Sequence, residues 1–359
     1  MKYNFGFNIG SKTIDIVQKP YFIADIAANH DGDIERARDL IYLAKEAGAD
    51  CAKFQHFKAD KIVSDKGFSS LASSKMSHQA SWEKSVAEIY DQYHTKREWN
   101  DVLIKTCQLA DIEFMTTPYD IEAMEGLIDN VNAIKIGSGD ITYIPFLESI
   151  AQLGKPVLLA TGASNINETI LAVKALVDIN RNVCLMQCNT NYTGDSSNFN
   201  FVNLNVLKTF STLYPNMPLG FSDHTPGHSA VLGAVTLGAR VIEKHFTDDN
   251  ARVGPDHHFA LNPETWRSMV DSTEELFAAL GDGVKRVEDN ETDTVIIQRR
   301  AIRLVRDAVK GEIIQLSDVD FLRPCPLDAI TPADLSSLIG RRIRTDKQKG
   351  DHLSISDLE

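Results

Sequence analysis

Long hydrophobic runs are missing from this sequence of 359 residues. No stretch reaches the roughly 18 uninterrupted apolar residues that a membrane-spanning helix needs. Residues 1–17, MKYNFGFNIGSKTIDIV, alternate and carry charge, so they lack the apolar segment of a signal peptide. We therefore expect a cytoplasmic protein that makes no use of a membrane.

Positive charge and cysteine are also scarce. The 37 Lys and Arg residues face 50 Asp and Glu residues, and the net charge of −13 argues against nucleic acid and anionic membrane surfaces as partners. The five cysteines are an odd set, and the one close pair, Cys184 and Cys188, does not have the spacing of a zinc site. Reduced, buried thiols are the expectation.

Apolar residues make up 43% of the chain, and many of them gather into eight short runs. Each run is nearly all apolar, which is typical of a parallel sheet with both faces buried. Eight strand–helix units in series predict an α/β fold, a closed (β/α)8 TIM barrel, with an open doubly wound sheet as the alternative. The barrel is favoured because no G-x-G-x-x-G follows the first strand. The expected strands are 21–30, 50–57, 112–120, 133–140, 156–162, 183–190, 218–225 and 241–247.

Helical periodicity fills the segments between these runs. The first segment ends at Gly48, a residue common just past a helix C-terminus. The expected helices are 33–49, 96–111, 120–130, 143–154, 165–180, 204–216, 228–239 and 263–281.

The pattern changes at both ends of the expected barrel. Residues 1–18 predict two short strands around a Gly-Ser turn. Residues 284–297 are polar and charged and predict a linker, whereas 298–359 combine short strands, Gly turns and one short helix. We predict a barrel domain over 1–283, which includes the hairpin, and a small β-rich domain over 298–359. Without disulfides so small a domain is marginal alone, so we expect it to lean on another surface.

Candidate functional residues follow from the fold, because enzymes of this architecture place their active site at the carboxyl ends of the strands. Since side chains alternate along a strand, Lys53 shares a face with Gln55, and His245 shares one with Glu243. The polar residues at the expected strand ends are Asp25, Asn29, His30, Lys53, Gln55, Thr116, Thr117, Lys135, Ser138, Asp140, Thr161, Asn189, Asn191, Tyr192, Ser222, Asp223, His224, Glu243 and His245.

Two histidines end neighbouring strands. His224 follows the seventh apolar run and His245 the eighth, so their imidazoles are expected to converge. Two imidazoles suit a divalent ion such as Mn²⁺, Zn²⁺ or Fe²⁺, with carboxylate, substrate or water completing the shell. The alternative is that each histidine caps a loop or bonds a backbone carbonyl.

Two lysines lie inside otherwise apolar runs. Lys53 and Lys135 are costly there unless each is paired or binds an anion. With hydroxyl groups nearby and the glycines of IGSGD allowing backbone amides to approach, they predict a clamp for phosphate or carboxylate. The alternative is that both lysines snorkel to the rim of the barrel.

These residues resemble those of the sialic acid synthases and, more broadly, the nonulosonic acid synthases, over essentially the whole chain. The shared stretches are ANHDGD at 28–33, AKFQ at 52–55, TPYD at 117–120, KIGSGD at 135–140, GKPVLLATG at 154–162, GFSDHT at 220–225, EKHFTDD at 243–249 and GPD at 254–256, with AVKGEII at 308–314 and FLRP at 321–324. The resemblance implies a TIM barrel with a C-terminal antifreeze-like (SAF) domain. It also implies an enzyme that condenses phosphoenolpyruvate with the open-chain aldehyde of an N-acetylated amino sugar.

The resemblance implies roles as well. Phosphoenolpyruvate would be held by Lys53, Gln55, Thr117, Lys135, Ser138 and Ser222. His224 and His245 would hold Mn²⁺, with Mg²⁺ or Co²⁺ as alternatives, and they would act in catalysis together with Asp25, Lys53 and Lys135. Tyr192 and Asp256 would contact the sugar, and the remaining substrate-binding residues would be Asp140, Thr161 and Asn189. Members act as homodimers in which the SAF domain of one chain closes the barrel of the other, so Arg323 would reach the acceptor in trans.

The chain also departs from the family pattern. Asp25 and Asp140 stand where the family usually has glutamate, and Ala160 where it often has serine. His257 and His258 occupy positions where many relatives differ, and residues 65–93 do not match the usual acceptor-binding loop. These departures are concentrated on the side of the site expected to bind the acceptor. We therefore expect a 6-deoxy or diacetamido hexose rather than N-acetylmannosamine.

Two other functions stay open at this point. A metal-dependent barrel hydrolase would need a further strong protein ligand, and His30 is the candidate. A catalytically altered sugar-binding homologue is the second alternative, because Asp25 is one methylene shorter than the glutamate of the family.

Overall fold

The computed structural model describes residues 1–71 and 84–359. They divide into a barrel unit, Met1–Gly281, and a second unit, Asp282–Glu359. Part of the segment 65–93, which does not match the family's acceptor loop, lies outside the described residues. Among the described residues, no helix is long and apolar enough to cross a membrane.

Eight parallel strands close the barrel unit, and this confirms the (β/α)8 TIM barrel over the open sheet. Hydrogen bonding joins them in the order β10-β3-β4-β5-β6-β7-β8-β9. The strands are β3 (Tyr21–Asp25), β4 (Cys51–His56), β5 (Glu113–Pro118), β6 (Ile134–Ile136), β7 (Val157–Ala160), β8 (Val183–Cys188), β9 (Leu219–Asp223) and β10 (Ala239–His245). All eight expected strands are present.

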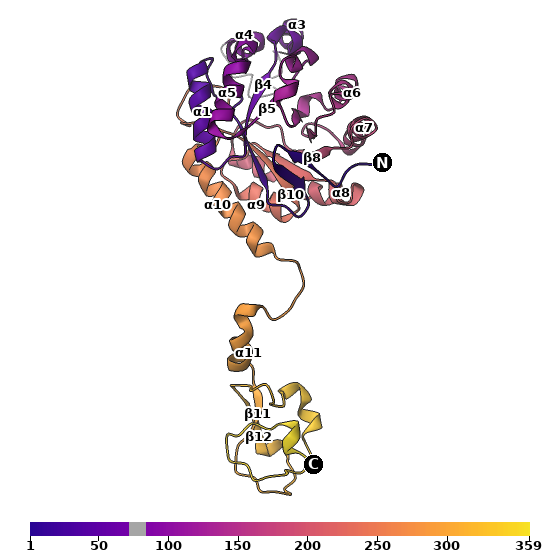
Figure 1. The fold of residues 1–359 in the computed structure, drawn as a ribbon, viewed down its shortest axis with the longest axis vertical. Helices are drawn as coiled ribbons and strands as arrows, with labels where there is room; N and C mark the ends of the chain where they lie inside the picture. Colours follow the sequence, from indigo (N-terminus) through magenta and orange to yellow (C-terminus); the bar gives the residue numbers. More distant parts are fainter. Residues whose placement is uncertain (72–83) are drawn as a thin grey trace. The chain divides into compact units, whose positions relative to one another are not determined.

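Helices surround the strands (Figure 1). Their starts are set locally: Asp33, Asn165 and Asn262 each cap the first turn of a helix with a side-chain oxygen. The outer helices are α1 (Ile34–Glu46), α5 (Asn100–Ala110), α6 (Ile144–Gln152), α7 (Ile166–Val177), α8 (Val206–Leu213), α9 (Ser229–Thr236) and α10 (Pro263–Leu280). Between β4 and α5 lie the short helices α2 (Ala59–Ile62), α3 (Asp65–Leu71) and α4 (Val86–Tyr93).

One expected helix is wrong. Residues 120–130 form two 3-10 turns, Ile121–Met124 and Ile128–Asn130, instead of a continuous α-helix. Gly126 lies between the turns with φ +74°, a left-handed conformation that interrupts a right-handed helix. The apolar spacing of this segment is that of a helix, but Glu125 is extended after the first turn and Gly126 follows in the left-handed conformation.

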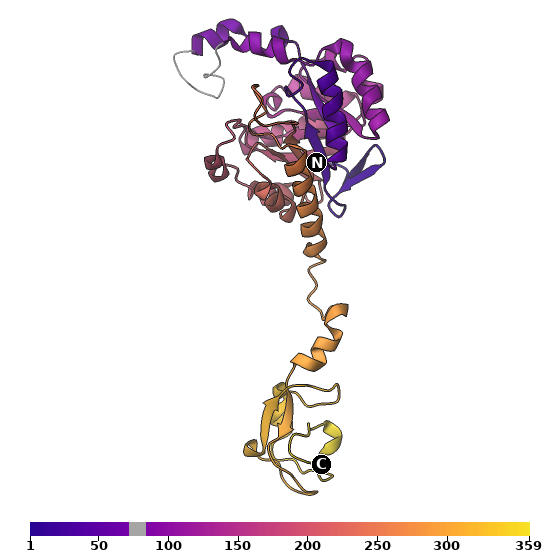
Figure 2. The ribbon, with the colours of Figure 1, turned by 90° about the vertical axis from the view of Figure 1, so that its left-hand side faces the viewer.

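The amino-terminal hairpin closes the end of the barrel opposite the strand carboxyl ends. Strands β1 (Gly6–Ile9) and β2 (Lys12–Asp15) pair antiparallel around Gly10 and Ser11, as expected. Phe7, Ile9 and Ile14 join one buried cluster with barrel residues such as Tyr21 and Cys51. Figure 2 shows the indigo hairpin and the short purple helices that follow β4 on opposite sides of the barrel unit. The hairpin end is therefore apolar, which leaves the other end for chemistry.

The second unit has its own small core. Strands β11 (Ala301–Leu304) and β12 (Val319–Leu322) pair antiparallel, and isolated bridges join the remaining segments. Ile302, Leu338, Ile343 and Leu353 are fully buried in its apolar cluster. Residues 284–297, expected as a linker, contain a 3-10 turn, Asp289–Glu291, and most of α11 (Thr292–Gln298).

Candidate active site

Strand register places the candidate residues around the barrel interior at the carboxyl ends of the strands. On the β10 side, His245 lies beside Asp25 of β3, which lies beside Lys53 of β4. Gln55 of β4 pairs in register with Thr117 of β5. Glu243 of β10 pairs with Ser222 of β9. Residues from distant parts of the sequence are thereby brought to one end of the barrel.

Buried charges form the centre of this set. Lys53, Lys135, Asp25 and Glu243 are each less than 5% exposed. Lys53 Nζ lies 2.7 Å from Asp25 Oδ2 and 3.9 Å from Glu243 Oε2, and Lys135 Nζ lies 3.1 Å from Glu243 Oε1. Neither lysine reaches the surface, so the snorkelling alternative is wrong.

The electrostatics of this buried network favour the charged forms. Burial raises the pKa of Asp25, but the charges of Lys53, His245 and Lys135 outweigh it and hold the pKa below its ordinary value. Glu243 behaves in the same way, since Lys135 and Lys53 lower its pKa more than burial raises it. Burial lowers the pKa of Lys53, and Asp25 with Glu243 reverse that shift and raise it.

Neutral side chains complete the hydrogen bonding of the network. Gln55 Nε2 donates to Asp25 Oδ2 over 3.1 Å, Lys53 Nζ donates to Thr117 Oγ1 over 3.0 Å, and Ser222 Oγ donates to Glu243 Oε1 over 3.0 Å. Asp25 Oδ1 and Glu243 Oε2 are buried without a hydrogen-bond partner. Those two oxygens are the acceptors that a bound group could still use.

Glu243 is the residue that sequence reasoning underrated. It was noted at a strand end, but no role was assigned to it, although it contacts both lysines. A signal was present in the sequence: Glu243 stands two residues before His245 in an apolar strand, and a carboxylate there needs a buried cation.

The two histidines converge, with ring centroids 5.4 Å apart. His224 Nδ1 donates to the carbonyl of Asn189 over 2.9 Å, so for this histidine the predicted alternative of a bond to a backbone carbonyl is present. The bond leaves the lone pair of Nε2 available to a metal ion. Burial lowers the pKa of His224, but Cys188, whose Sγ lies 3.9 Å from Nδ1, and the Asn189 carbonyl raise it overall. Burial keeps the pKa of His245 below its ordinary value, so that ring is neutral near pH 7.

These donors fit a divalent ion that takes only part of its shell from protein. His245 Nδ1 is buried without a hydrogen-bond partner, and Asp25 Oδ2 lies 3.8 Å from His245 Nε2. Within residues 1–71 and 84–359, no group of three or more His, Cys, Asp or Glu is arranged to hold a metal. His30 lies apart, packed edge-on against Trp99 with its Nδ1 accepting from Gly32 N. His30 therefore does not supply the further ligand that a metallohydrolase would need.

Three predicted residues cluster beyond β6 and β7. Ser138 Oγ accepts from Gly162 N over 2.9 Å, and Thr161 Oγ1 donates to the carbonyl of Met186 over 2.9 Å. The hydroxyl of Thr161 is thus engaged with the barrel wall. Asp140 Oδ2 is buried without a hydrogen-bond partner, and burial raises the pKa of Asp140 to about 6. A carboxyl group with this pKa can exchange protons near neutral pH.

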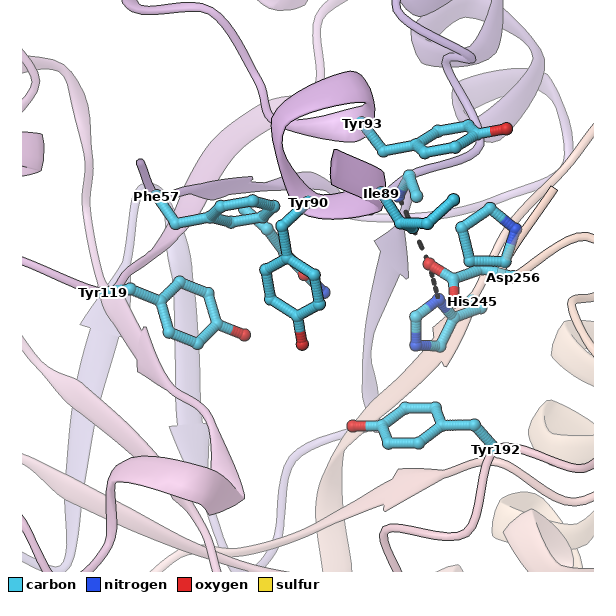
Figure 3. A pocket seen from close by; sticks show the side chains of 11 residues that line it. Phe57, Ile89, Tyr90, Tyr93, Tyr119, Tyr192, His245 and Asp256 are labelled. Carbon is cyan, nitrogen blue, oxygen red and sulfur yellow. Dashed lines mark hydrogen bonds and ion pairs between the residues drawn. The ribbon is translucent and has the colours of Figure 1, made fainter. Parts of the chain in front are cut away.

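A cavity opens above the charged network, and aromatic rings make up much of its lining. Figure 3 shows Phe57, Tyr90 and Tyr119 on one side and His245 with Asp256 on the other. The ring centroid of Phe57 lies 5.2 Å from that of Tyr90 and 5.7 Å from that of Tyr119. Four aromatic rings and one isoleucine beside them form a set that we call the aromatic wall: Phe57, Ile89, Tyr90, Tyr93 and Tyr119. The aromatic wall was not predicted from the sequence, because its residues come from a strand end, a turn and α4.

The remaining predicted substrate residues divide between the cavity and elsewhere. Asp256 lines the cavity, and its Oδ2 accepts from Ala28 N over 3.3 Å and lies 3.7 Å from His245 Nδ1. Tyr192 also lines the cavity, with its ring centroid 4.4 Å from that of His224. Arg323 lies in the second unit, exposed, just after β12.

Comparison with known proteins gives matches along most of the chain. Residues 40–285 match the NeuB family, and residues 299–359 match the SAF domain. An uncharacterized protein of Methanocaldococcus jannaschii is 35% identical over 352 residues, covering 98% of each chain. The N,N'-diacetyllegionaminic acid synthase of Legionella pneumophila is 34% identical, covering 94% of each chain. The crystal structure of an N-acetylneuraminic acid synthetase from Leptospira borgpetersenii, in complex with citrate, is 26% identical with a TM-score of 0.71, covering 81% of this chain and 95% of that one.

Removing one buried lysine tests the charge network. Lys53→Met should lower the free energy of unfolding at pH 7 by about 3–5 kcal/mol, because Asp25 and Glu243 lose a buried cation. Lys174→Met is the control: its partner Asp178 is exposed just after the end of α7, and the loss should be at most about 0.5 kcal/mol. Denaturant unfolding followed by circular dichroism measures both.

The loss of stability in Lys53→Met should depend on pH. The depressed carboxyl pKa values of Asp25 and Glu243 stabilise the wild type above the unfolded pKa of about 4, and this contribution is lost as the pH falls through the folded values. Without Lys53, burial raises the pKa values of Asp25 and Glu243 in the folded variant. Acidification therefore protonates these carboxylates and removes the destabilising effect of their buried charges. The stability gap between wild type and Lys53→Met should narrow from pH 7 towards pH 4. A gap that stays constant over this range would contradict the assigned pairing.

Proposed function

Because the chain belongs to the NeuB family, whose members are phosphoenolpyruvate-dependent synthases and transferases, we propose that it condenses phosphoenolpyruvate with an amino-sugar aldehyde. The acceptor is the open-chain form of an N-acetylated amino sugar, and the products are a nonulosonic acid and inorganic phosphate. The observation that carries the proposal is the pair of buried lysines, Lys53 and Lys135, beneath a cavity that His245 also lines.

Phosphoenolpyruvate is assigned to the lower part of the site. Its phosphate and carboxylate are strongly anionic, and buried lysines and hydroxyls are the donors that such groups require. In the structure both lysine charges are balanced by Asp25 and Glu243, so a bound anion has to share those cations. The groups assigned to it are Lys53, Gln55, Thr117, Lys135, Ser138 and Ser222.

The reaction forms one carbon–carbon bond and breaks one carbon–oxygen bond. C3 of phosphoenolpyruvate bonds to the aldehyde carbon, water adds at C2, and phosphate leaves with the bridging oxygen. A divalent ion, Mn²⁺ or alternatively Mg²⁺ or Co²⁺, held by His224 and His245, would polarise the aldehyde. Lys53 and Lys135 neutralise charge on the departing phosphate, and Asp140 is kept among the groups that bind substrate.

The acceptor is assigned to the cavity. The aromatic wall offers apolar faces, which suit methyl groups and the carbon face of a sugar ring. Among the described lining residues there is no Lys or Arg, and Asp256 carries the opposite charge to the one a phosphate needs. The missing cation argues against a sugar phosphate, and the apolar faces favour the methyl groups of a 6-deoxy or diacetamido hexose over the 6-hydroxyl of N-acetylmannosamine. The name of the Legionella relative, a diacetyllegionaminic acid synthase, agrees with this assignment.

The second unit is assigned to the same site by way of a homodimer. We propose that the SAF domain of one subunit covers the barrel of the other and supplies Arg323 to the acceptor. The exposure of Arg323 leaves its guanidinium accessible for such a contact.

The alternatives are less well supported. A metal-dependent hydrolase leaves Lys53 and Lys135 unexplained, and His30 does not join the two histidines. A catalytically altered binding protein was suggested by Asp25, yet the shorter side chain still reaches Lys53 over 2.7 Å.

Phosphate release is the primary test. Purified protein with phosphoenolpyruvate, Mn²⁺ and a diacetamido hexose should release phosphate only when all three are present. His224→Ala should lower kcat by at least about a hundredfold while the circular dichroism spectrum is retained. In water enriched in ¹⁸O, the label should enter the keto acid and be absent from phosphate. Label in phosphate would mean P–O cleavage and would refute the proposed chemistry.

Acceptor preference tests the aromatic wall. Of two N-acetylated sugars that differ only in a 6-deoxy or 6-hydroxyl group, the 6-deoxy sugar should have a kcat/KM about tenfold higher. Ile89→Asn should reduce that ratio, whereas Ile166→Asn, on an exposed position of α7 outside the cavity lining, should leave it unchanged. Preference for the 6-hydroxyl sugar, or for its phosphate ester, would overturn the acceptor assignment.

Mixing two inactive variants tests the shared site. Arg323→Ala and His224→Ala are each expected to be nearly inactive. A mixed dimer pairs an intact barrel with an intact Arg323, so equal mixing should restore about a quarter of wild-type activity. Activity that stays at the level of the separate variants after confirmed subunit exchange would show that Arg323 does not act in trans.

A further inference from the structure

Two loops at the carboxyl end of the barrel are fastened together by a buried histidine and an aspartate. They are residues 26–33, after β3, and residues 247–262, after β10. We infer that the Asp31–His257 pair, which we call the clasp, joins these two loops by a buried hydrogen bond and thereby positions Asp256 in the cavity. The inference rests on the proposed function in that Asp256 is assigned to the acceptor, and His257 is a positioning residue that need not touch substrate.

His257 has both ring nitrogens engaged. Its side chain is completely buried, with Nε2 2.9 Å from Asp31 Oδ1 and Nδ1 2.7 Å from Thr247 Oγ1. The loop folds tightly against the ring, since a Cβ at Gly254 would lie 2.6 Å from His257 Cδ2. An imidazole is therefore built into the loop where two directed hydrogen bonds hold it.

Asp31 also accepts hydrogen bonds from Arg252 in the second loop and lies close to Arg36 of α1. Its Oδ2 accepts from Arg252 Nε and Nη2 over 3.0 and 2.9 Å, and it lies 3.2 Å from Arg36 Nε. Arg36 at the start of α1 also donates through Nη1 to Asp248 Oδ2 over 2.7 Å. Asp31 adopts φ +53°, a strained conformation for a residue with a side chain, which the surrounding bonds hold in place.

The clasp lies next to a residue of the cavity. Asp256 directly precedes His257 and is held from the other loop, because Ala28 N donates to its Oδ2 over 3.3 Å. The two loops meet at Ala28–Asp256, at Asp31–Arg252 and at Asp31–His257. The first contact is long and the Arg252 side chain is 41% exposed, so the fully buried Asp31–His257 bond is the contact that fixes the loop beside Asp256. Figure 3 shows Asp256 beside His245, where a shift of the loop would move its carboxylate out of the cavity.

Hydrogen exchange tests the clasp without any assay of activity. In His257→Ala the amides of segments 26–33 and 247–262 should exchange at least about tenfold faster than in wild type. His257→Gln, which keeps a donor near the position of Nε2, should restore much of the protection. His258→Ala is the matched control, because His258 is exposed on the same loop and contacts Thr193 instead of Asp31. Unchanged exchange in His257→Ala would overturn the clasp.

Kinetics then test the positioning role. His257→Ala should raise the KM for the acceptor about tenfold and leave the KM for phosphoenolpyruvate within about twofold, with partial rescue in His257→Gln. In an Asp256→Asn background the same change should have no further effect, because it acts through Asp256. Equal increases in both KM values, or full additivity with Asp256→Asn, would refute the role. If the wild type turns over no sugar, the proposed function fails, and the exchange experiment still decides the clasp.

Discussion

Two ammonium groups and two carboxylates are buried together inside the barrel, and the other residues of the site are arranged around them. Lys53 and Lys135 are stable in the interior only because Asp25 and Glu243 lie within ion-pair distance. The partners come from β3, β4, β6 and β10, so no single hairpin or helix could assemble them. Closure of the sheet is what brings β10 beside β3 and completes the network.

This constraint explains why the two ends of the barrel differ. At the end closed by the hairpin, Phe7, Ile9 and Ile14 pack with predominantly apolar barrel residues. At the other end the same strands carry charged side chains, whose hydrogen bonds are supplied by Gln55, Thr117 and Ser222. Packing at the hairpin end helps to hold the strands in register. The register in turn sets the distances between the charged side chains at the carboxyl ends of the strands.

In the proposed function, the acceptor is selected one layer further out. The charged network suits any anion of the right size, but the cavity above it is lined by Phe57, Tyr90 and Tyr119 and by a single carboxylate, Asp256, among the described residues. Since Asp256 is carried by a loop, its position depends on what fastens that loop. The Asp31–His257 pair joins the segments 26–33 and 247–262 together with Ala28–Asp256 and Asp31–Arg252, and it is the buried one of these contacts.

The periodicity of the sequence by itself determined the barrel, because eight apolar runs with helical segments between them have few other ways to bury both sheet faces. It also placed Lys53, Lys135, His224 and His245 at strand ends, since alternation along a strand is a local property. It did not place the helix expected at 120–130 correctly, because Gly126 broke a pattern that spacing alone supported.

Only the tertiary structure decided which charges meet. That Glu243 contacts both lysines, that α4 contributes to the aromatic wall, and that His257 holds Asp31 are all contacts between segments far apart in the chain. Sequence spacing carries no record of such distances, because they are set by barrel closure and by how loops pack above it. The strand ends were therefore predictable from local pattern, and the partners of each side chain were fixed only when the chain folded.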